Sequence, residues 1–163
     1  MATYRKLLKN RNGDIIIPVT DYDERGRFSR YMNSNQTIAT LTATTIKMGA
    51  KDFNEKKCSY SSSTGLVTIQ QAGIWQLNGY GRYSTEVATY GLVGIILNGT
   101  LVSGFGGTAS ANASTFRSGH GGVSTLIHLN VGDTIGLRIT PSSEITNNAR
   151  THGQLSGFCV FPD

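Results

Sequence analysis

The second half of the chain alternates between apolar and polar residues, a pattern that predicts short β-strands. The clearest run covers residues 74–83. One face of this run carries Trp75, Leu77, Gly79, Gly81 and Tyr83. The other face carries Ile74, Gln76, Asn78, Tyr80 and Arg82. Alternation with a period of two, with aromatic residues, is typical of a strand that is buried on one side only.

Turn signals divide the rest of this region into further strands. Residues 90–97 are mostly apolar and end in Asn98–Gly99, a dipeptide that favours a hairpin because both turn positions need a positive φ. Val131–Gly132–Asp133 predicts another tight turn, in which the Asp133 carboxylate caps backbone amides. No segment of this region carries a helix signature. About eight to ten short strands with regular turns predict an all-β sandwich or barrel.

The first part of the chain has a different character. Residues 4–8 suit a helical turn, residues 15–19 are β-prone but contain Pro18, and residues 21–30 are dense in charge. Proline confines such a segment to a sheet edge or an extended conformation. We therefore predict an N-terminal arm over residues 1–36 and a head domain over residues 37–163.

Composition and charge narrow the class of protein. The chain has 163 residues, which suits one domain, and charged residues make up 15% of it, against about 25% in an average soluble protein. This low charge excludes a helical bundle or a coiled coil. The net charge of +5 comes from residues 1–57, with 11 basic and 6 acidic side chains, while residues 58–163 have 4 of each. A neutral body argues against nucleic-acid binding, which uses a basic face.

Two kinds of segment that would place the chain in or across a membrane are not recognisable. No apolar stretch approaches the length of a membrane-spanning helix. The only apolar run near the basic N-terminus, residues 15–17, is too short for a secretory signal. We expect a protein that is made in a cytoplasm, inserts into no membrane, and leaves the cell, if it does, by a route such as a virus particle.

Four segments, in order, resemble the C1q-like domain family. They are TGLVTI at 64–69 with AGIW at 72–75, LNG at 97–99, LIHLNVGDTI at 126–135 and LSGFCVF at 155–161. The resemblance implies a ten-stranded jelly roll of the C1q and tumour-necrosis-factor superfamily that assembles as a homotrimer. The collagen-like stalk of animal members is absent from the sequence. The body also has few of the acidic residues that hold calcium in some relatives, so no metal is expected.

The N-terminal residues carry a second resemblance. The segments YRKLLKN at 4–10 and IIIPVT at 15–20 are similar to short N-terminal segments on structural proteins of phages that infect Gram-positive bacteria. This resemblance implies a virion protein located on a fibre, on the tail or on the head as a decoration.

Residues with possible chemistry are mostly explained by packing. Trp75 has two interpretations, a core residue and a sugar-stacking platform, of which the core is favoured. The residues predicted for the structural core are Trp75, Leu77, Leu137, Phe158 and Phe161, with the two phenylalanines alternatively in a trimer interface. Cys58 and Cys159 are predicted to be buried free thiols, because they lack the spacing of a metal site or a disulfide scaffold.

Catalysis has little support in the sequence. His120, His128 and His152 are too scattered for a metal site, and Asp133 has no titratable neighbour in sequence with which to act as an acid or base. There is no nucleophile elbow, P-loop or dinucleotide fingerprint. We therefore predict no catalytic residue, no cofactor and no metal.

Two groups of residues are candidates for recognition. If the family topology holds, residues 49–57 and the turn before the last strand meet at the apex away from the termini. The apex candidates are Lys51, Asn54, Lys56, Arg150 and His152. A basic apex suits an anionic wall polymer such as teichoic acid, and the alternative is a set of solvated charges. The second group lies in a long Gly/Ser-rich loop predicted over residues 103–122, which is either a recognition loop or a flexible solvated one. The candidates there are Phe105, Asn112, Phe116 and Arg117.

The functional hypothesis that follows is a non-enzymatic, trimeric phage virion protein. Its arm would attach to other virion proteins, and its head would bind host cell-wall glycan, an anionic polymer or another virion protein. The alternative from a different class is a bacterial surface or spore-coat adhesion module, and a small hydrolase is a remote third.

Overall fold

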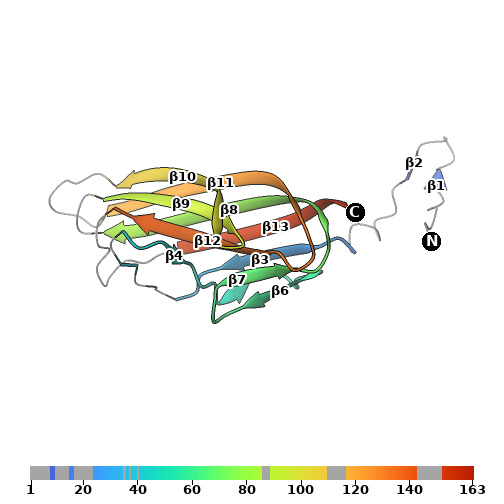
Figure 1. Ribbon diagram of the computed structural model, residues 1–163, viewed down its shortest axis with the longest axis horizontal. Helices are drawn as coiled ribbons and strands as arrows, with labels where there is room; N and C mark the ends of the chain where they lie inside the picture. The colour runs from blue at the N-terminus through green and yellow to red at the C-terminus, as the bar shows by residue number, and fades with distance from the viewer. Residues whose placement is uncertain are drawn as a thin grey trace.

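Two antiparallel β-sheets stack face to face in the computed structural model (Figure 1). The structure describes residues 8–9, 15–16, 24–34, 36, 38–39, 41–85, 89–109, 117–142 and 152–163. Within these residues there are strands and turns and no helix. The fold is therefore all-β, as the alternation in the sequence predicts.

The six-stranded sheet holds the Asn-Gly hairpin. Its order is β10 (Thr100–Ala109), β9 (Thr89–Leu97), β12 (Thr134–Pro141), β7 (Leu66–Ile69) and β6 (Cys58–Ser61), with β4 (Thr44–Thr45) also paired to β12. Asn98 and Gly99 have φ values of 50° and 83°, as the hairpin turn between β9 and β10 requires.

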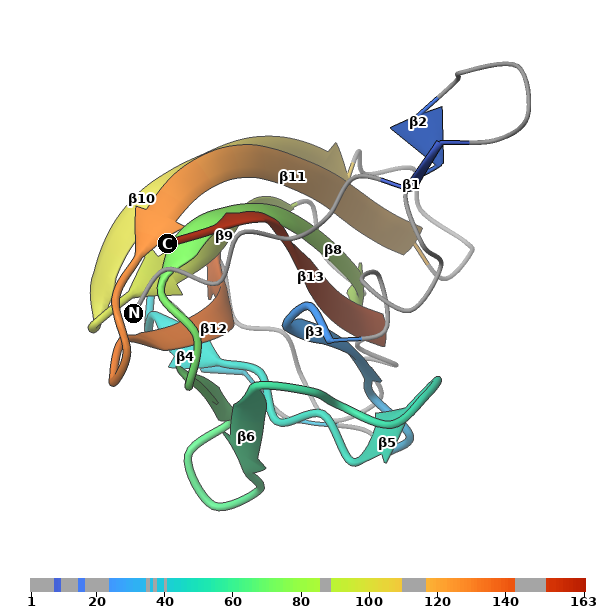
Figure 2. The same cartoon turned by 90° about the vertical axis from the view of Figure 1, so that its right-hand side faces the viewer.

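The five-stranded sheet is built around the strand with the clearest alternation. Its order is β11 (Arg117–Leu129), β8 (Gly73–Thr85), β13 (His152–Pro162), β3 (Arg27–Tyr31) and β5 (Ala50–Lys51). Seen end-on, β10 and β11 lie side by side at one edge of the sandwich, and β5 and β6 lie toward the other (Figure 2). The two sheets together have 11 strands, one more than the resemblance implies, and β1 (Leu8–Lys9) and β2 (Ile15–Ile16) form a separate antiparallel pair.

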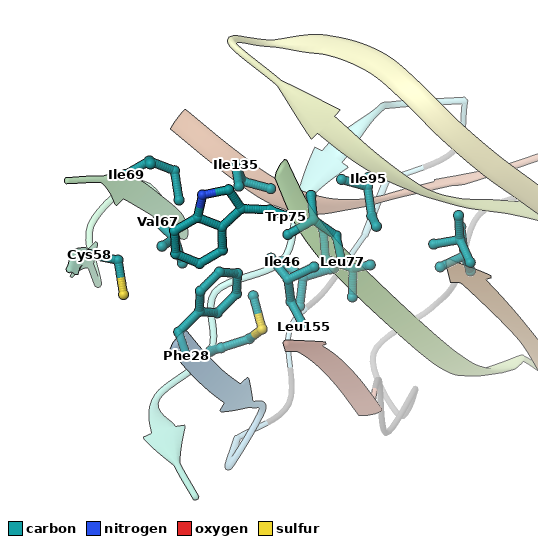
Figure 3. Packing of buried hydrophobic residues seen from close by; sticks show 14 of the residues in the cluster. Phe28, Ile46, Cys58, Val67, Ile69, Trp75, Leu77, Ile95, Ile135 and Leu155 are labelled. Carbon is teal, nitrogen blue, oxygen red and sulfur yellow. The ribbon is translucent and has the colours of Figure 1, made fainter. Parts of the chain in front are cut away.

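The core fills the space between the two sheets. Trp75, Leu77 and Leu137, three positions predicted for it, are 0–1% exposed. The Trp75 indole lies close to Val67, Ile135 and Phe28, and its Nε1 donates a hydrogen bond of 3.1 Å to the Gln71 carbonyl oxygen (Figure 3). A fully buried indole offers no ring face to a sugar, so the stacking-platform alternative is wrong.

The two C-terminal phenylalanines do not belong to this core. Phe158 is only partly buried, and Phe161 is 62% exposed, so its prediction as a core residue of the single chain is wrong. The reason is a register shift between Cys159 and Phe161. It places Phe161 opposite Ile74 on the outer side of the sheet, whereas unbroken alternation would have turned the ring inward.

The predicted boundary at residue 36 is too far along the chain. Residues 27–31 form β3, which pairs with β13 and β5, and Phe28 is completely buried. The charged residues that suggested an arm outside the head domain are accommodated at the sheet. Arg30 makes two hydrogen bonds of 2.6 and 2.7 Å to the Glu55 carboxylate and lies 4.1 Å from the centre of the Tyr60 ring. The head domain thus includes β3.

The loop predicted over residues 103–122 is also largely strand. Residues up to Ala109 continue β10, and residues from Arg117 onward belong to β11. Small residues indicated a loop, but here they form two long strands, and residues 110–116 lie outside the described part of the chain.

Asp133 ties two turns together at one end of the six-stranded sheet. Its carboxylate accepts hydrogen bonds of 2.8 Å from the Asn130 backbone N–H and from the Asn98 side-chain amide. These hydrogen bonds hold the pKa of Asp133 below its usual value. Asp133 therefore caps a turn, as the sequence predicts, and also joins the β11–β12 turn to the β9–β10 hairpin.

Replacing Gly157 with alanine should destabilise the fold. The new Cβ would overlap the Phe28 ring and lie 2.9 Å from Leu77 Cδ2, and both side chains are buried. We expect a loss of about 1–3 kcal/mol in the free energy of unfolding, measured by urea denaturation. Gly122→Ala is the matched control, because its nearest neighbour would be 3.9 Å away. Equal stability of the two variants would contradict this packing.

Replacing Asp133 with asparagine should lower stability by about 1 kcal/mol near neutral pH, since an amide oxygen replaces a charged acceptor. The lowered pKa means that the carboxylate stabilises the fold above its unfolded pKa of about 3.9, and that this contribution is lost as pH falls through the folded pKa. Denaturation between about pH 7 and pH 3 should therefore show the difference between Asp133→Asn and wild type shrinking with acidity. A constant difference would show that the titration of Asp133 is not coupled to folding.

Candidate functional site

The outer side of the five-stranded sheet, called the outward face below, is the candidate site. Residues on this face alternate with buried ones, so Gln76, Asn78 and Tyr80 project from β8 between Trp75, Leu77 and Gly79. The pairing register arranges the outward residues in rows across the strands. Starting from the end of the face near the C-terminus, the rows are Phe161–Ile74–His128, Arg27–Phe158–Gln76–Leu126, Ser29–Ser156–Asn78–Ser124 and Tyr31–Gln154–Tyr80–Gly122. Arg82 is exposed two residues after Tyr80 on β8.

The end of this face near the C-terminus is apolar. Leu126 is 57% exposed and Phe161 is 62% exposed, while Ile74 and Phe158 are partly buried beside them. Arg25 lies 5.9 Å from the centre of the Phe158 ring, and its Nη1 donates a hydrogen bond to the Val160 carbonyl oxygen. Arg25 therefore places a cation beside the Phe158 ring at the edge of the apolar end.

The middle of the outward face carries uncharged hydrogen-bonding groups. Gln76 Nε2 donates to the Ser124 hydroxyl at 2.7 Å, and that hydroxyl donates to Asn78 Oδ1 at 2.9 Å. In the next row Tyr31 and Tyr80 stand on either side of Gln154, with 39% and 40% of their surfaces exposed. Amides, hydroxyls and tyrosines of this kind suit contact with another protein surface.

Charged side chains on the outward face lie at its margins. His128 Nε2 lies 3.0 Å from an Asp163 carboxylate oxygen at the C-terminal end. Asp52 accepts a hydrogen bond from the Ser29 hydroxyl, and Arg27 lies 6.0 Å from the centre of the exposed Phe53 ring. The centre of the face is therefore neutral, with Arg82 beyond it at the opposite end.

The predicted basic apex is only partly assembled. The backbone of Lys51 in β5 is paired with that of Arg30 in β3, near the end of the sheet where β13 begins. The Lys51 side chain is exposed. Lys56 lies elsewhere, because residues 51–56 run back along β3 until Lys56 bridges to Arg27, at the level of Phe158. Its Nζ is 3.9 Å from a Glu24 carboxylate oxygen. The prediction that Lys56 belongs to the apex is wrong, because this segment follows the sheet edge instead of turning at its end.

The remaining apex candidates have different placements. Asn54 is exposed between Lys51 and Lys56 on the same edge segment. His152 is the first residue of β13, and its backbone lies opposite Arg82. Arg150 lies outside the described residues.

The loop candidates are separated by the strands that replace the predicted loop. Phe105 lies in β10 opposite Val93, and Arg117 begins β11 opposite Thr85, so the two belong to different sheets. Asn112 and Phe116 lie outside the described residues.

The two free cysteines are buried, and their burial decides what chemistry they offer. Burial raises the pKa of the Cys58 thiol to about 12, with the nearby Glu55 carboxylate adding to the effect, and burial also raises the pKa of Cys159. Neither thiol is a ready nucleophile, because the thiolate is the reactive form. Among the described residues, no group of three or more His, Cys, Asp or Glu side chains could hold a metal ion. No helix within the described ranges is long and apolar enough to cross a membrane.

Comparison with known proteins identifies the type of fold. No family model matches the sequence, and no curated protein matches it. The solved globular domain of zebrafish complement 1qA protein is similar in structure, with a TM-score of 0.54. The alignment covers 86% of this chain and 100% of that chain. The fold is C1q-like. At 16% sequence identity the likeness concerns the fold, which is a two-sheet sandwich without helices in the described residues.

Sequence reasoning gave no function to most residues of the outward face. The alternation over residues 74–83 already separated Ile74, Gln76, Asn78, Tyr80 and Arg82 from the buried positions. The signal was present on one strand, but the row partners on β3, β11 and β13 depend on pairing between residues more than 35 positions apart in the chain. Tyr31, Leu126 and Gln154 were missed for this reason.

Proposed function

We propose that this protein is a non-enzymatic, trimeric structural protein of a phage particle. In this proposal the C1q-like domain packs against two further copies through the outward face. The N-terminal residues attach it to other virion proteins, and the exposed remainder of the head binds the host surface or another virion component. The observation that carries the proposal is the outward face, where Leu126 and Phe161 are more than half exposed next to a neutral centre.

The energetics of the outward face favour self-association. Removing exposed apolar surface from water on association is favourable by roughly 25 cal/mol of free energy for each Å². A contiguous patch of exposed apolar side chains on a soluble protein commonly marks an interaction site. Because the middle of the face lacks charged side chains, two copies can approach without desolvating an unpaired ion. The C1q resemblance implies that the number of copies is three.

The virion role is supported by the N-terminal residues. Their resemblance to segments on phage structural proteins suits an attachment element that stands before the head domain, and β1 and β2 pair with each other apart from the two main sheets. Three heads on one particle site would also multiply a weak affinity for a surface.

A bacterial surface or spore-coat adhesion module is the alternative. It shares the trimeric head and differs in what the N-terminal residues attach to. A hydrolase is disfavoured, because in the described part of the chain the His128 ring is hydrogen-bonded to Asp163 and to no hydroxyl or thiol.

Introducing a charge into the apolar end of the outward face should dissociate the assembly. We expect the full-length wild type to have three times the 17.5 kDa mass of one chain, and Leu126→Asp to have the mass of one chain or to associate at least about tenfold more weakly. Analytical ultracentrifugation measures both.

Val131→Asp is the matched control, since Val131 is 66% exposed in the turn between β11 and β12. It should leave the mass unchanged. A wild type that sediments as a single chain would contradict the trimer. Dissociation of Val131→Asp but not of Leu126→Asp would show that the interface does not involve the outward face.

The place of the protein can be tested with antibodies against the full chain. Labelling of purified phage particles from the encoding host, viewed by electron microscopy, is the expected result. Labelling of cells or spores that carry no particles, with unlabelled particles, would replace the virion role with the adhesion module.

A further inference from the structure

An asparagine followed by a glycine occupies the tip of the β9–β10 hairpin. Asn98 and Gly99 are both exposed, and a Cβ built on Gly99 would meet no atom within 4 Å. Within the described ranges, the Gly99 backbone N–H donates to no acceptor. Once it loses its proton, this nitrogen is a nucleophile placed next in the chain to the Asn98 side chain, and glycine adds no side chain that would hinder it.

The Asn98 carboxamide is anchored at both its oxygen and its nitrogen. Its Oδ1 accepts hydrogen bonds from the Thr134 backbone N–H at 2.8 Å and from the Thr134 hydroxyl at 3.2 Å. Its Nδ2 donates to Asp133 Oδ1 at 2.8 Å. Only one orientation of the carboxamide satisfies these groups, because an N–H can only donate and an ionised carboxylate can only accept. The side chain of one residue thus binds the hairpin tip to the start of β12.

Asp133 is itself held in place. Its other oxygen accepts a hydrogen bond of 2.8 Å from the Asn130 backbone N–H. The hydrogen bonds from Asn130 and Asn98 hold the pKa of Asp133 below its usual value, so the group is ionised at neutral pH. A hydrogen bond to an ionised acceptor is stronger than one between neutral groups. The hydrogen bond to Asp133 therefore contributes most to anchoring the carboxamide.

We infer that Asn98 is a site of spontaneous deamidation and that Asp133 and Thr134 restrain the reaction in the folded protein. The Gly99 nitrogen gives its proton to a solvent base and bonds to Asn98 Cγ. The Cγ–Nδ2 bond then breaks, and the nitrogen leaves as ammonia with a proton from solvent. Water opens the resulting imide at either carbonyl and releases a proton, which leaves an aspartate or an isoaspartate.

The restraint follows from the direction of attack. A nucleophile approaches an amide carbon from above the plane of the carboxamide, whereas hydrogen bonds to the carboxamide lie near that plane. The Asn98 side chain must therefore rotate before the ring can close, and rotation breaks its hydrogen bonds to Thr134 and Asp133. Reaction is fast only where the two reacting atoms are already positioned for attack.

The same dipeptide occurs at Asn78–Gly79 in a different setting. Gly79 is buried inside β8, where it is paired with Val123 of β11 and with Leu155 of β13. The backbone of Gly79 is therefore held by strands on both sides, whereas Gly99 belongs to a turn. We expect Asn78 to remain unmodified in the folded protein. It is an internal control of identical local sequence.

Deamidation would replace a donor with an acceptor where the two turns meet. The new oxygen would face Asp133 Oδ1, which Asn98 Nδ2 now approaches to 2.8 Å. Two ionised carboxylates at such a distance repel, and one of them takes up a proton more readily. The modified chain would lose the link between hairpin and turn, and the modified fraction would rise with the age of the protein. The site belongs to the six-stranded sheet, so the inference does not depend on the proposed trimer.

The test follows tryptic peptides of the full-length protein by mass spectrometry during incubation at mildly alkaline pH. Cleavage after lysine and arginine places Asn78 in residues 58–82 and Asn98 in residues 83–117. Fragmentation distinguishes Asn98 from Asn112 in the second peptide. In urea both Asn-Gly sites should react at similar rates, since the sequence is the same. In the folded wild type, Asn98 should react measurably but at least about tenfold more slowly than in urea, and Asn78 should not react.

Variants test the restraint. Asp133→Ala should accelerate the reaction at Asn98 about tenfold in the folded protein, the effect of losing one charge-assisted hydrogen bond. Thr134→Val is a milder second variant, because it removes the hydroxyl and keeps the backbone N–H, and it should give a smaller acceleration. Gly157→Ala is the matched control, since it weakens packing in the five-stranded sheet and leaves the carboxamide contacts in place. It should react at Asn98 as wild type does.

Three results would overturn the inference. An Asn98 that stays unmodified in folded wild type, Asp133→Ala and Thr134→Val would remove the site. Equal acceleration in Asp133→Ala and Gly157→Ala, or equal reaction of Asn78 and Asn98 in Asp133→Ala, would assign the reaction to global unfolding. Unchanged rates in both Asp133→Ala and Thr134→Val would remove the restraint.

A separate measurement tests the consequence of the modification. Asn98→Asp reproduces one product, and it should unfold at a lower urea concentration than wild type at neutral pH. The difference should shrink at about pH 4, because protonation of either carboxylate relieves the repulsion. A variant as stable as wild type at neutral pH would contradict the loss of the link between the two turns.

Discussion

The pairing of β8 with its two neighbours is the constraint on which the rest of the structure depends. This strand pairs with β11 over its whole length and with β13 from Gly73 to Arg82. Its inner side supplies Trp75 and Leu77 to the core, and its outer side supplies the middle of the outward face. One register therefore sets both the packing between the sheets and the arrangement of the surface. A shift by one residue would exchange the two sides.

Close packing between the sheets depends on small residues at the inner positions of these strands. A Cβ at Gly79 would lie 2.8 Å from Leu137 Cδ1, and one at Gly81 would lie 2.9 Å from Ile139 Cδ1. The same two glycines alternate along β8 with the exposed residues Asn78, Tyr80 and Arg82. The high glycine content, 20 of 163 residues, thus lets the six-stranded sheet approach closely. It leaves the outer positions of the same strands free to carry amides, tyrosines and cations.

The strands that the sequence predicted well are those whose alternation is uninterrupted. Residues 74–82 and 135–139 form strands with the expected buried sides, and the Asn98–Gly99 turn has the backbone that its dipeptide favours. The predictions failed where a local signal was overridden by pairing. The charge density of residues 21–30 suggested an N-terminal arm, yet Glu55 and Tyr60 accommodate Arg30 beside β3. Small residues after Ser103 suggested a loop, yet they extend β10 and β11.

By itself, the sequence determined the all-β class and most of the buried positions, because alternation is a local property that each strand carries within a few residues. Tertiary structure alone decided which residues share the outward face, because strand order and register join segments far apart in the chain. The register shift after Cys159 turned Phe161 outward, and pairing across β3, β13 and β8 brought Tyr31, Gln154 and Tyr80 into one row. Neither result has a signal within a single strand, since each depends on the partner that the backbone hydrogen bonds select.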